Sequence, residues 1–283
     1  MKIVILGSGG FISKAVQNEL EKFKVSILAI PRNKIDLTKK NSSKKLAKII
    51  KSSDRVFFAA AEAPVKNEKM LINNLLISKT VCELVNKISP SYLLYLSSDA
   101  VYSDSKRLLC EKSVAQPSSI HGIMHYAREV MLKNSYKGKM CIVRPTLIYG
   151  KNDPHNGYGP NRFVRLVKKG QNITLFGKGE ELRDHIWVQD VAEIIAKLIL
   201  FKKIGTFNLV TGKVISFKNI AKKIMEASNK KLKGEKLTKI LYTKRIGPIP
   251  HGGWRAFRRS NYKTIFPNFK FKTFDEVLPK LIN

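Results

Sequence analysis

Residues 2–13 of the chain, KIVILGSGGFIS, join a short apolar run to a cluster of glycines. The run Lys2–Leu6 predicts a buried strand, and apolar residues at helical spacing in Phe11–Phe23 predict a helix after the glycines. Glycines at this junction allow a tight turn and a close approach of the backbone to a pyrophosphate, which the helix N-terminus then stabilises. Ser13 replaces the usual third glycine and is small enough to keep the helix close to the strand. A strand, a glycine turn and a helix in this order predict a dinucleotide site.

Short apolar runs alternate with helical patterns on the C-terminal side of this turn. Strands are predicted at Val25–Ile30, Val56–Ala60, Tyr92–Leu96 and Met140–Val143, and helices at Ser42–Lys51, Glu68–Ile88 and Ile123–Lys133. Continuous apolar strands separated by helices indicate a parallel sheet covered on both faces. The fold class is therefore α/β, a Rossmann doubly wound parallel sheet.

The pattern loosens after Gly150. Residues 151–159 are rich in Gly, Asn, Pro and His and predict a loop, while Val188–Phe201 predicts a strongly apolar helix. A strand is expected at 206–210, and further helices at 216–227 and 274–281. We expect a dinucleotide-binding domain at 1–150, to which 184–210 return, and a smaller C-terminal substrate lobe at 151–183 and 211–283.

The charge of the chain is unusual, because 53 Lys and Arg stand against 21 Asp and Glu, a formal net charge of +32. Such a surface attracts nucleotides, nucleic acid and other anions. The lysines are dispersed, and no basic stripe alternates with aromatics in the manner of RNA-binding proteins. Binding of nucleic acid is thus not the favoured interpretation.

Neither a membrane segment nor a metal site is expected. Apolar runs stay well below the ~18 residues that span a bilayer. Cys82, Cys110 and Cys141 are odd in number and widely spaced, which is typical of reduced thiols in a cytoplasmic protein.

The end of the second predicted strand bears on the cofactor. An NAD site usually has Asp or Glu there for the ribose hydroxyls, whereas arginine accommodates a 2′-phosphate. Arg32 and Lys34 stand at this point without an acid. NADP is therefore favoured as the cofactor, with NAD as the alternative.

Several further motifs, in the right order along nearly the whole chain, resemble the extended short-chain dehydrogenase/reductase family, the NAD(P)-dependent epimerases and dehydratases of nucleotide sugars. Ala59-Ala60-Ala61 and SSDAVY at 97–102 follow strands, RPTLIYG at 144–150 resembles RPxxxYG, and RDHIWVQDV at 183–191 resembles RDFxxVxDV. The resemblance and the glycine turn together imply cofactor contacts from Gly7, Gly9, Gly10, Phe11, Ile12, Arg32, Asp36, Leu37, Ala60, Asn74, His125 and Pro145.

The sequence departs from the family where the chemistry is expected. The family places Tyr and Lys four residues apart, as YGxxKxxxE, and the best match here, HGIMHYARE at 121–129, has histidine at both places. A competing alignment starts at Tyr126 but puts Val130 at the lysine place and loses the glycine. We prefer the alignment that gives His121 and His125.

Histidine can perform the expected proton transfer, because its ordinary pKa near ~6.5 suits general acid–base work at neutral pH. His121 would take the task of the tyrosine with Ser98 as its hydrogen-bond partner, and His125, one turn on, would hold the ribose or tune His121. Three alternatives stay open: a zinc site at HisxxxHis, a cofactor-binding protein without turnover, and Tyr126 as the acid–base group.

The resemblance also implies a substrate side. The polar loop at 155–163 would face the sugar, and Arg183 would hold the diphosphate of a nucleotide sugar, since guanidinium grips phosphate oxygens in pairs. Candidate substrate residues are Asp99, Asn161, Arg162, Arg183 and Arg255. Relatives commonly form homodimers through a helix pair, which here would be 68–88 and 123–133.

The leading hypothesis is an NAD(P)-dependent oxidoreductase, epimerase or dehydratase acting on a nucleotide sugar or a related polyhydroxylated anion, with Ser98 and His121 as the proton-transfer pair. The alternative is a catalytically silent family member that binds the cofactor and serves as a sensor, scaffold or RNA-associated protein.

Overall fold

The computed structural model describes residues 1–229, 237–259 and 261–282. They form two compact units. The first consists of Met1–Ser103, Glu111–Thr146 and Val191–Leu209, and the second of Asp104–Cys110, Leu147–Asp190 and the described residues from Val210 onwards. Residues 104–110, 147–150 and 184–190, expected in the first domain, thus make their contacts in the second unit. Every helix within the described ranges is too short or too polar to cross a membrane.

The first unit is built on a six-stranded parallel sheet. Its strands, in the order β2-β1-β3-β4-β5-β9, are β2 (Ser26–Ile30), β1 (Lys2–Leu6), β3 (Arg55–Phe58), β4 (Tyr92–Leu96), β5 (Met140–Pro145) and β9 (Gly205–Leu209). Strands β1, β3 and β4 are almost fully buried, which explains their continuous apolar sequences.

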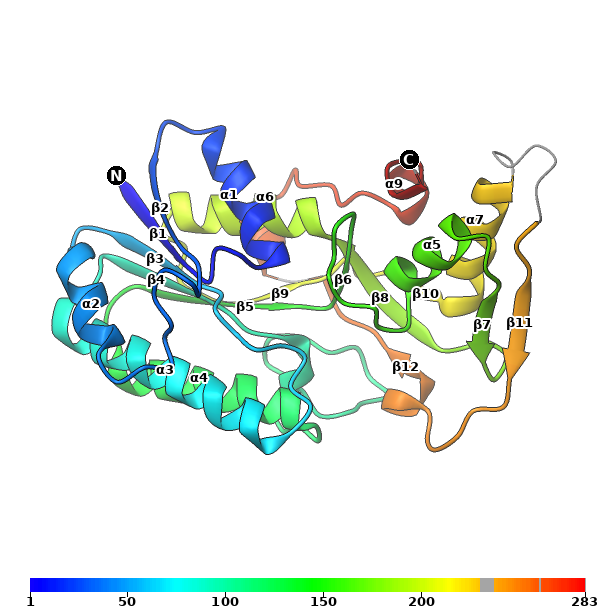
Figure 1. Ribbon diagram of the computed structural model, residues 1–283, viewed down its shortest axis with the longest axis horizontal. Helices are drawn as coiled ribbons and strands as arrows, with labels where there is room; N and C mark the ends of the chain where they lie inside the picture. Colours follow the sequence, from blue (N-terminus) through cyan, green and yellow to red (C-terminus); the bar gives the residue numbers. More distant parts are fainter. Residues whose placement is uncertain (230–236, 260, 283) are drawn as a thin grey trace. The chain divides into compact units, whose positions relative to one another are not determined.

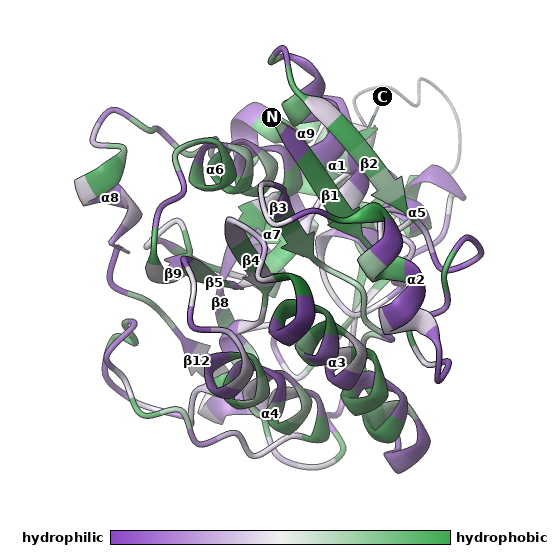
Figure 2. Cartoon of the chain, turned by 90° about the vertical axis from the view of Figure 1, so that its left-hand side faces the viewer, coloured by the Kyte–Doolittle hydropathy of each residue, from purple (hydrophilic) through white to green (hydrophobic). Residues whose placement is uncertain are grey.

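Helices cover both faces of this sheet (Figure 1). Helices α2 (Ser42–Ile49), α3 (Glu68–Ile88) and α4 (Ile120–Ser135) lie on one face, and α1 (Phe11–Glu21) and the body of α6 (Val188–Leu200) on the other. Figure 2 shows α3 and α4 side by side, each with hydrophobic and hydrophilic residues. This arrangement confirms the doubly wound Rossmann architecture.

Local chemistry sets the ends of the helices that matter for the site. The side chain of Asn67 accepts a hydrogen bond from the Met70 amide and starts α3, which ends where Ser89 adopts a left-handed conformation. The hydroxyl of Ser119 accepts a hydrogen bond from the Gly122 amide and starts α4. Helix α4 therefore begins before His121, three residues earlier than expected.

The second unit contains a smaller mixed sheet and a helical layer. Strand β8 (Leu182–Trp187) pairs antiparallel with β10 (Val214–Ser216) and parallel with β12 (Trp254–Arg255) and β6 (Leu147–Tyr149), while β7 (Ile173–Phe176) pairs with β11 (Ile240–Thr243). The helices are α5 (Pro160–Lys168), α7 (Phe217–Asn229), α8 (Tyr262–Ile265) and α9 (Phe274–Ile282), with a 3₁₀ turn, η2, at Pro250–Gly253. Phe163, Ile173, Phe217 and Leu281 belong to its core.

Candidate functional site

The glycine turn after β1 has the geometry expected of a phosphate-binding turn. Gly7 has φ +87°, and a Cβ atom there would lie 2.5 Å from the Cα atom of Ala60, so a side chain is excluded. Helix α1 starts at Gly10 without a side-chain cap, which leaves the amides of its first turn without a side-chain acceptor. Ser13 is buried, as its role as a small packing residue requires. Such a helix start can bind a pyrophosphate.

A cavity of about 190 Å³ adjoins this turn at the carboxyl ends of β1, β2 and β3. This is where the strand order reverses and where ligands of doubly wound sheets bind. Seven of the twelve predicted cofactor residues line it, namely Gly7, Gly9, Gly10, Arg32, Asp36, Leu37 and Ala60. The other five, Phe11, Ile12, Asn74, His125 and Pro145, do not line this cavity.

Arg32 reaches the cavity but is engaged by two carboxylates. Its guanidinium donates a 2.7 Å hydrogen bond to Glu62 and lies 3.5 Å from a carboxylate oxygen of Asp36. The hydrogen bond to Glu62 is the main reason that the pKa of Arg32 is raised, and hydrogen bonds from Thr38 are the main reason that the pKa of Asp36 is lowered. Glu62 also lines the cavity and was not predicted from the sequence.

Asn74 acts inside the protein. It is fully buried, and its side chain bonds both the amide and the carbonyl of Glu62, at 3.0 and 2.9 Å. Arg128, also fully buried, donates to the carbonyl of Ala60 at 2.7 Å and stacks on Phe58 at 4.5 Å. The two side chains therefore fix the segment after β3 that lines the cavity. Arg128 was missed because nothing in its sequence context distinguishes it from an exposed helix arginine.

The N-terminus of α4 lies against the turn that follows β4. A Cβ atom on Gly122 would collide with the backbone of Ala100 and with Pro117, so only glycine allows this approach. Ser98 caps the 3₁₀ turn η1 (Asp99–Val101), since its hydroxyl accepts a 3.1 Å hydrogen bond from the Ala100 amide. The structure thus brings the segments that carry Ser98 and His121 together.

His121 and His125 lie on one face of α4, with ring centroids 4.8 Å apart and nearly perpendicular. Nδ1 of His121 accepts a 3.4 Å hydrogen bond from the Val65 amide, which leaves the proton of the neutral ring on Nε2. His125 is buried, with Nδ1 2.8 Å from the hydroxyl of Tyr95. Burial, then the nearby His121 and Arg128, hold the pKa of His125 well below the ordinary value, so its ring is neutral at pH 7.

The remaining residues of the α4 motif have separate places. Tyr126 is 37% exposed, whereas Glu129 is fully buried and accepts two hydrogen bonds from Arg144, at 2.9 and 2.6 Å. Ser97 donates to the same carboxylate at 2.6 Å. This buried network links α4 to the ends of β4 and β5 and so fixes the helix that carries the histidines. Within the described residues, no third metal-binding side chain joins the two histidines.

In the second unit, Arg183 is buried on β8 and ion-paired with Glu181, to which its Nε donates at 2.9 Å. Glu181 also pairs with Arg245 at 2.9 Å, and Arg183 donates to the carbonyl of Pro250 at 3.0 Å. One carboxylate therefore serves two guanidinium groups, which leaves this cluster with a net positive charge. Glu181 and Arg245 were not predicted, because the second arginine lies 64 residues away from the acid.

The other substrate candidates fall in three places. Asn161 lies in the first turn of α5, where it accepts from the Gly150 amide at 3.1 Å and donates to Asp153, whereas Arg162 is exposed. Arg255 on β12 is buried and contacts Asp104 at 3.2 Å. Asp99 lies in η1 of the first unit. The loop expected at 155–163 is thus half helix.

Comparison with protein families decides the identity of the chain. Residues 3–209 match the model of the NAD dependent epimerase/dehydratase family. The chain belongs to this family. The match covers the glycine turn, the α4 motif and Arg183, so the family resemblance of the sequence is confirmed.

Solved structures agree on the fold. The chain is 23% identical to a UDP-glucose 4-epimerase of Thermus thermophilus, solved with NAD, over 100% of this chain and 98% of the other, with a TM-score of 0.80. It is 22% identical to UDP-N-acetylglucosamine 4-epimerase of Methanobrevibacter ruminantium over 99% and 96%, with a TM-score of 0.81. A dTDP-4-dehydrorhamnose reductase of Clostridium acetobutylicum shares 19% identity over 100% and 98%, with a TM-score of 0.81.

Proposed function

We propose that this protein is an NAD(P)-dependent epimerase, dehydratase or reductase of a nucleotide sugar, with Ser98 and His121 as its proton-transfer pair. The observation that carries the proposal is the placement of His121. Its Nδ1 is held by the Val65 amide, its helix is pressed against the turn after Ser98, and its Nε2 carries the proton in the neutral form.

The cofactor in this proposal is NADP, with NAD as the alternative. The uncapped start of α1 and the small cavity beside it fit a pyrophosphate and an adenosine. Arg32 would bind the 2′-phosphate after releasing Glu62, and Asp36 and Leu37 would lie near the adenine. When bound, the nicotinamide would supply the acceptor or donor of hydride.

In the tautomer that the Val65 amide favours, Nε2–H of His121 would hydrogen-bond a substrate oxygen. To remove a proton from a substrate hydroxyl, the ring would first release the Val65 amide and carry its own proton on Nδ1, so that Nε2 takes the substrate proton and later returns it. Ser98 would orient the same oxygen through its hydroxyl. His125 would act as a neutral hydrogen-bonding group toward the cofactor, because its burial disfavours the charge that lysine supplies in the family.

Two features support a nucleotide sugar as the substrate class. The structures with similar folds include an epimerase solved with UDP-glucose, from Thermotoga maritima. Arg183 and Arg245 share one carboxylate, so their donors exceed the acceptors that Glu181 offers. Asn161, Arg162, Arg255 and Asp99 complete the proposed substrate set.

A second candidate is a family member that binds the cofactor without turnover. The observation that favours it is His125, whose neutral ring cannot reproduce the lysine charge that the family uses to lower the pKa of the catalytic group. In that case the protein would be a sensor, scaffold or RNA-associated protein, and Ser98 would be only the cap of η1.

We also propose a homodimer formed through α3 and α4, in the cytoplasm. Ile72 and Leu76 on α3 and Ile123, Tyr126 and Val130 on α4 are 37–56% exposed. Adjacent exposed apolar residues on two neighbouring helices are typical of a subunit interface. This role also accounts for the exposure of Tyr126 better than proton transfer does.

Product analysis separates the two candidates. The purified protein is incubated with NADP or NAD and each of UDP-glucose, UDP-N-acetylglucosamine and dTDP-glucose, and new sugar resonances are followed by proton NMR. The enzyme proposal expects conversion of at least one sugar, lost in His121→Ala and Ser98→Ala. Cofactor binding without conversion of any of the three would favour the silent member.

A further inference from the structure

A second, larger cavity lies wholly within the second unit. It measures about 610 Å³ and is lined by β8, the 211–215 segment, α7 and the segment from Arg259 to Asp275. None of the residues proposed to bind the substrate lines it. A cavity of this size is typical of sites that enclose a small molecule. The reaction proposed above leaves it without a role.

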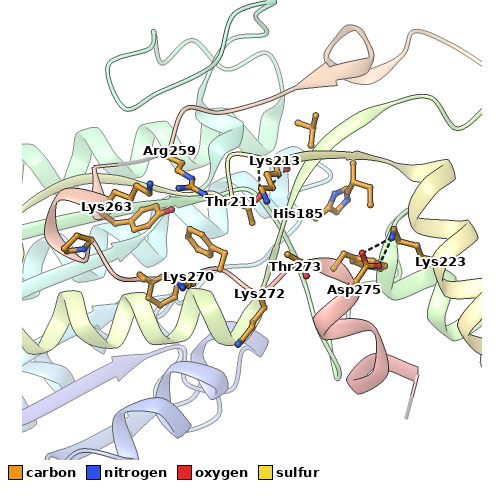
Figure 3. Close-up of a pocket in the computed structure, with 17 residues that line it drawn as sticks. His185, Thr211, Lys213, Lys223, Arg259, Lys263, Lys270, Lys272, Thr273 and Asp275 are labelled. Carbon is orange, nitrogen blue, oxygen red and sulfur yellow. Dashed lines mark hydrogen bonds and ion pairs between the residues drawn. The ribbon is translucent and has the colours of Figure 1, made fainter.

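The lining is more basic than the chain as a whole. Six of its 17 residues are Lys or Arg, about 35%, against 53 of 283, about 19%, in the sequence. They come from separate segments and surround the cavity in Figure 3, with Arg259 and Lys263 at one end and Lys223 at the other. Positive charge is therefore more concentrated around this cavity than the basic composition of the chain alone would give.

Asp275 is the one carboxylate among the 17 lining residues, and Asp184, Asp190 and Glu276 lie behind the lining. Asp275 pairs with Lys223 at 2.7 Å. The side chains of the other five cations, Lys213, Arg259, Lys263, Lys270 and Lys272, form no ion pair within the described part of the chain. The lining itself, with six positive groups and one negative group, has a formal charge of +5, which the three acids behind it offset in part. A multivalent anion would offset the mutual repulsion of the cations.

One ring nitrogen of His185, in the wall of the cavity, has no hydrogen-bond partner among the described residues. The residue is 93% buried, and its Nδ1 lies 3.2 Å from the carbonyl of Arg183, which fixes the proton on Nδ1. The nitrogen without a partner in the described part of the chain is Nε2, which is buried. Burial is the main cause of a lowered pKa, about 4, so at neutral pH Nε2 is an acceptor. This atom is closed off from solvent, and the ring lies edge-on to Phe217 with centroids 5.5 Å apart, so His185 contributes an apolar, uncharged part of the wall.

The loop that carries Lys213 is fixed in place. Asp184 accepts hydrogen bonds from the amides of Thr211 and Gly212, at 3.1 and 2.8 Å, and from the Thr211 hydroxyl at 2.7 Å. On another wall, the rings of Tyr262, Phe269 and Phe271 pack together with centroids 5.0–6.4 Å apart. An aromatic wall beside fixed cations suits a ring compound that carries phosphate.

We propose that this cavity is a second ligand site, which binds a phosphorylated sugar: the lysines and Arg259 hold the phosphate, and the aromatic wall contacts the ring. The shared chemistry is a phosphate ester on a hydroxylated ring, whether in a sugar phosphate or in a nucleotide. The proposal does not depend on the reaction proposed for the first unit.

Isothermal titration calorimetry of the full chain tests it, with glucose 6-phosphate, UDP and inorganic phosphate as separate probes. The double variant Lys263→Ala/Lys270→Ala should weaken sugar-phosphate or UDP binding about tenfold or more, since two charge-assisted contacts are lost. Lys222→Ala, an exposed lysine of α7 outside the lining, should leave that binding unchanged.

The same titrations distinguish the two ligand sources. The tighter of UDP and glucose 6-phosphate identifies the source, and binding that the double variant weakens and Lys222→Ala does not supports the site. Equal loss in Lys222→Ala, no loss in the double variant, or binding of single-stranded RNA in place of both small ligands would overturn the proposal.

Discussion

The selection of the cofactor depends on one arginine, and removing it has a calculable consequence. Arg32 lines the first cavity, and its side chain is 63% exposed. In the proposed complex it exchanges the 2.7 Å hydrogen bond to Glu62 for the 2′-phosphate of NADP. We expect Arg32→Ala to weaken NADPH binding and to leave NADH binding nearly unchanged, because NADH has no phosphate at that position.

The size of the effect follows from the exposure. Two charge-assisted hydrogen bonds would contribute about 3–6 kcal/mol if they were fully protected from water. At a site this exposed, solvent and salt reduce the gain to roughly 1–2 kcal/mol, or about 5- to 30-fold in Kd. Glu62→Gln acts in the opposite direction: it removes a competing anion, worth about 1 kcal/mol, and should tighten NADPH binding about fivefold.

Fluorescence titration of NADPH and NADH at fixed ionic strength measures both Kd values for each variant. Lys45→Ala on α2 is the matched control, since this exposed lysine lies outside the cavity lining. If Arg32→Ala weakens the binding of both cofactors equally, or if Glu62→Gln leaves the Kd of NADPH unchanged, Arg32 does not bind the 2′-phosphate and the proposed preference for NADP is wrong.

Three further predictions concern stability, each measured by urea unfolding. Gly122→Ala forces α4 away from the turn after β4 and should lower the free energy of unfolding by about 2 kcal/mol or more. Gly157→Ala, at a position with open space around it, should lower it much less, and equal losses would contradict the packing argument. Glu129→Gln breaks a buried ion pair and should lower the free energy of unfolding by about 3 kcal/mol. Glu193→Gln, in an ion pair exposed to solvent, should lower it by less than about 1 kcal/mol. A similarly small loss in Glu129→Gln would show that the buried network is not stabilising. His185 has a pKa of about 4 in the folded protein, below its ordinary value, so the unfolded chain binds the proton more readily between pH 4 and about pH 6.5. The free energy of unfolding should therefore rise with pH across this window by up to about 3 kcal/mol, and His185→Gln should flatten the curve.

The first unit was predictable from the sequence because its signals are local. The strands Lys2–Leu6 and Tyr92–Leu96 and the helix Glu68–Ile88 have the bounds expected from them. Apolar runs and a capping asparagine act over a few residues and leave little choice of structure. The glycine turn is also a local signal, because the positive φ of Gly7, +87°, favours glycine there.

The second unit was less predictable. Helix α5 begins at Pro160, directly after a polar loop, and its amphipathic sequence was taken as part of that loop. Strand β8 carries Arg183, Asp184 and His185, which are polar and yet buried. Alternation of polar and apolar residues, the usual signal of a half-buried strand, is absent where both faces hold polar networks.

The candidate site shows the same limit. His121 and His125 were found by their spacing, but the neutral state of His125 depends on its burial and then on the nearby His121 and Arg128, which spacing does not reveal. Glu62 engages Arg32 from 30 residues away, so the pairing depends on the fold. Partners brought together by tertiary structure have no local signal in the sequence.

Single-turnover absorbance at 340 nm tests the central claim, that the imidazole of His121 moves the proton, most directly. Protein saturated with NADP is mixed with the nucleotide sugar that it converts, and the formation of reduced cofactor is compared among wild type, His121→Ala and Tyr126→Phe. We predict a loss of about 100-fold or more in His121→Ala with unchanged NADPH affinity, and a wild-type rate in Tyr126→Phe. A wild-type rate in His121→Ala, or a comparable loss in Tyr126→Phe, would contradict the account.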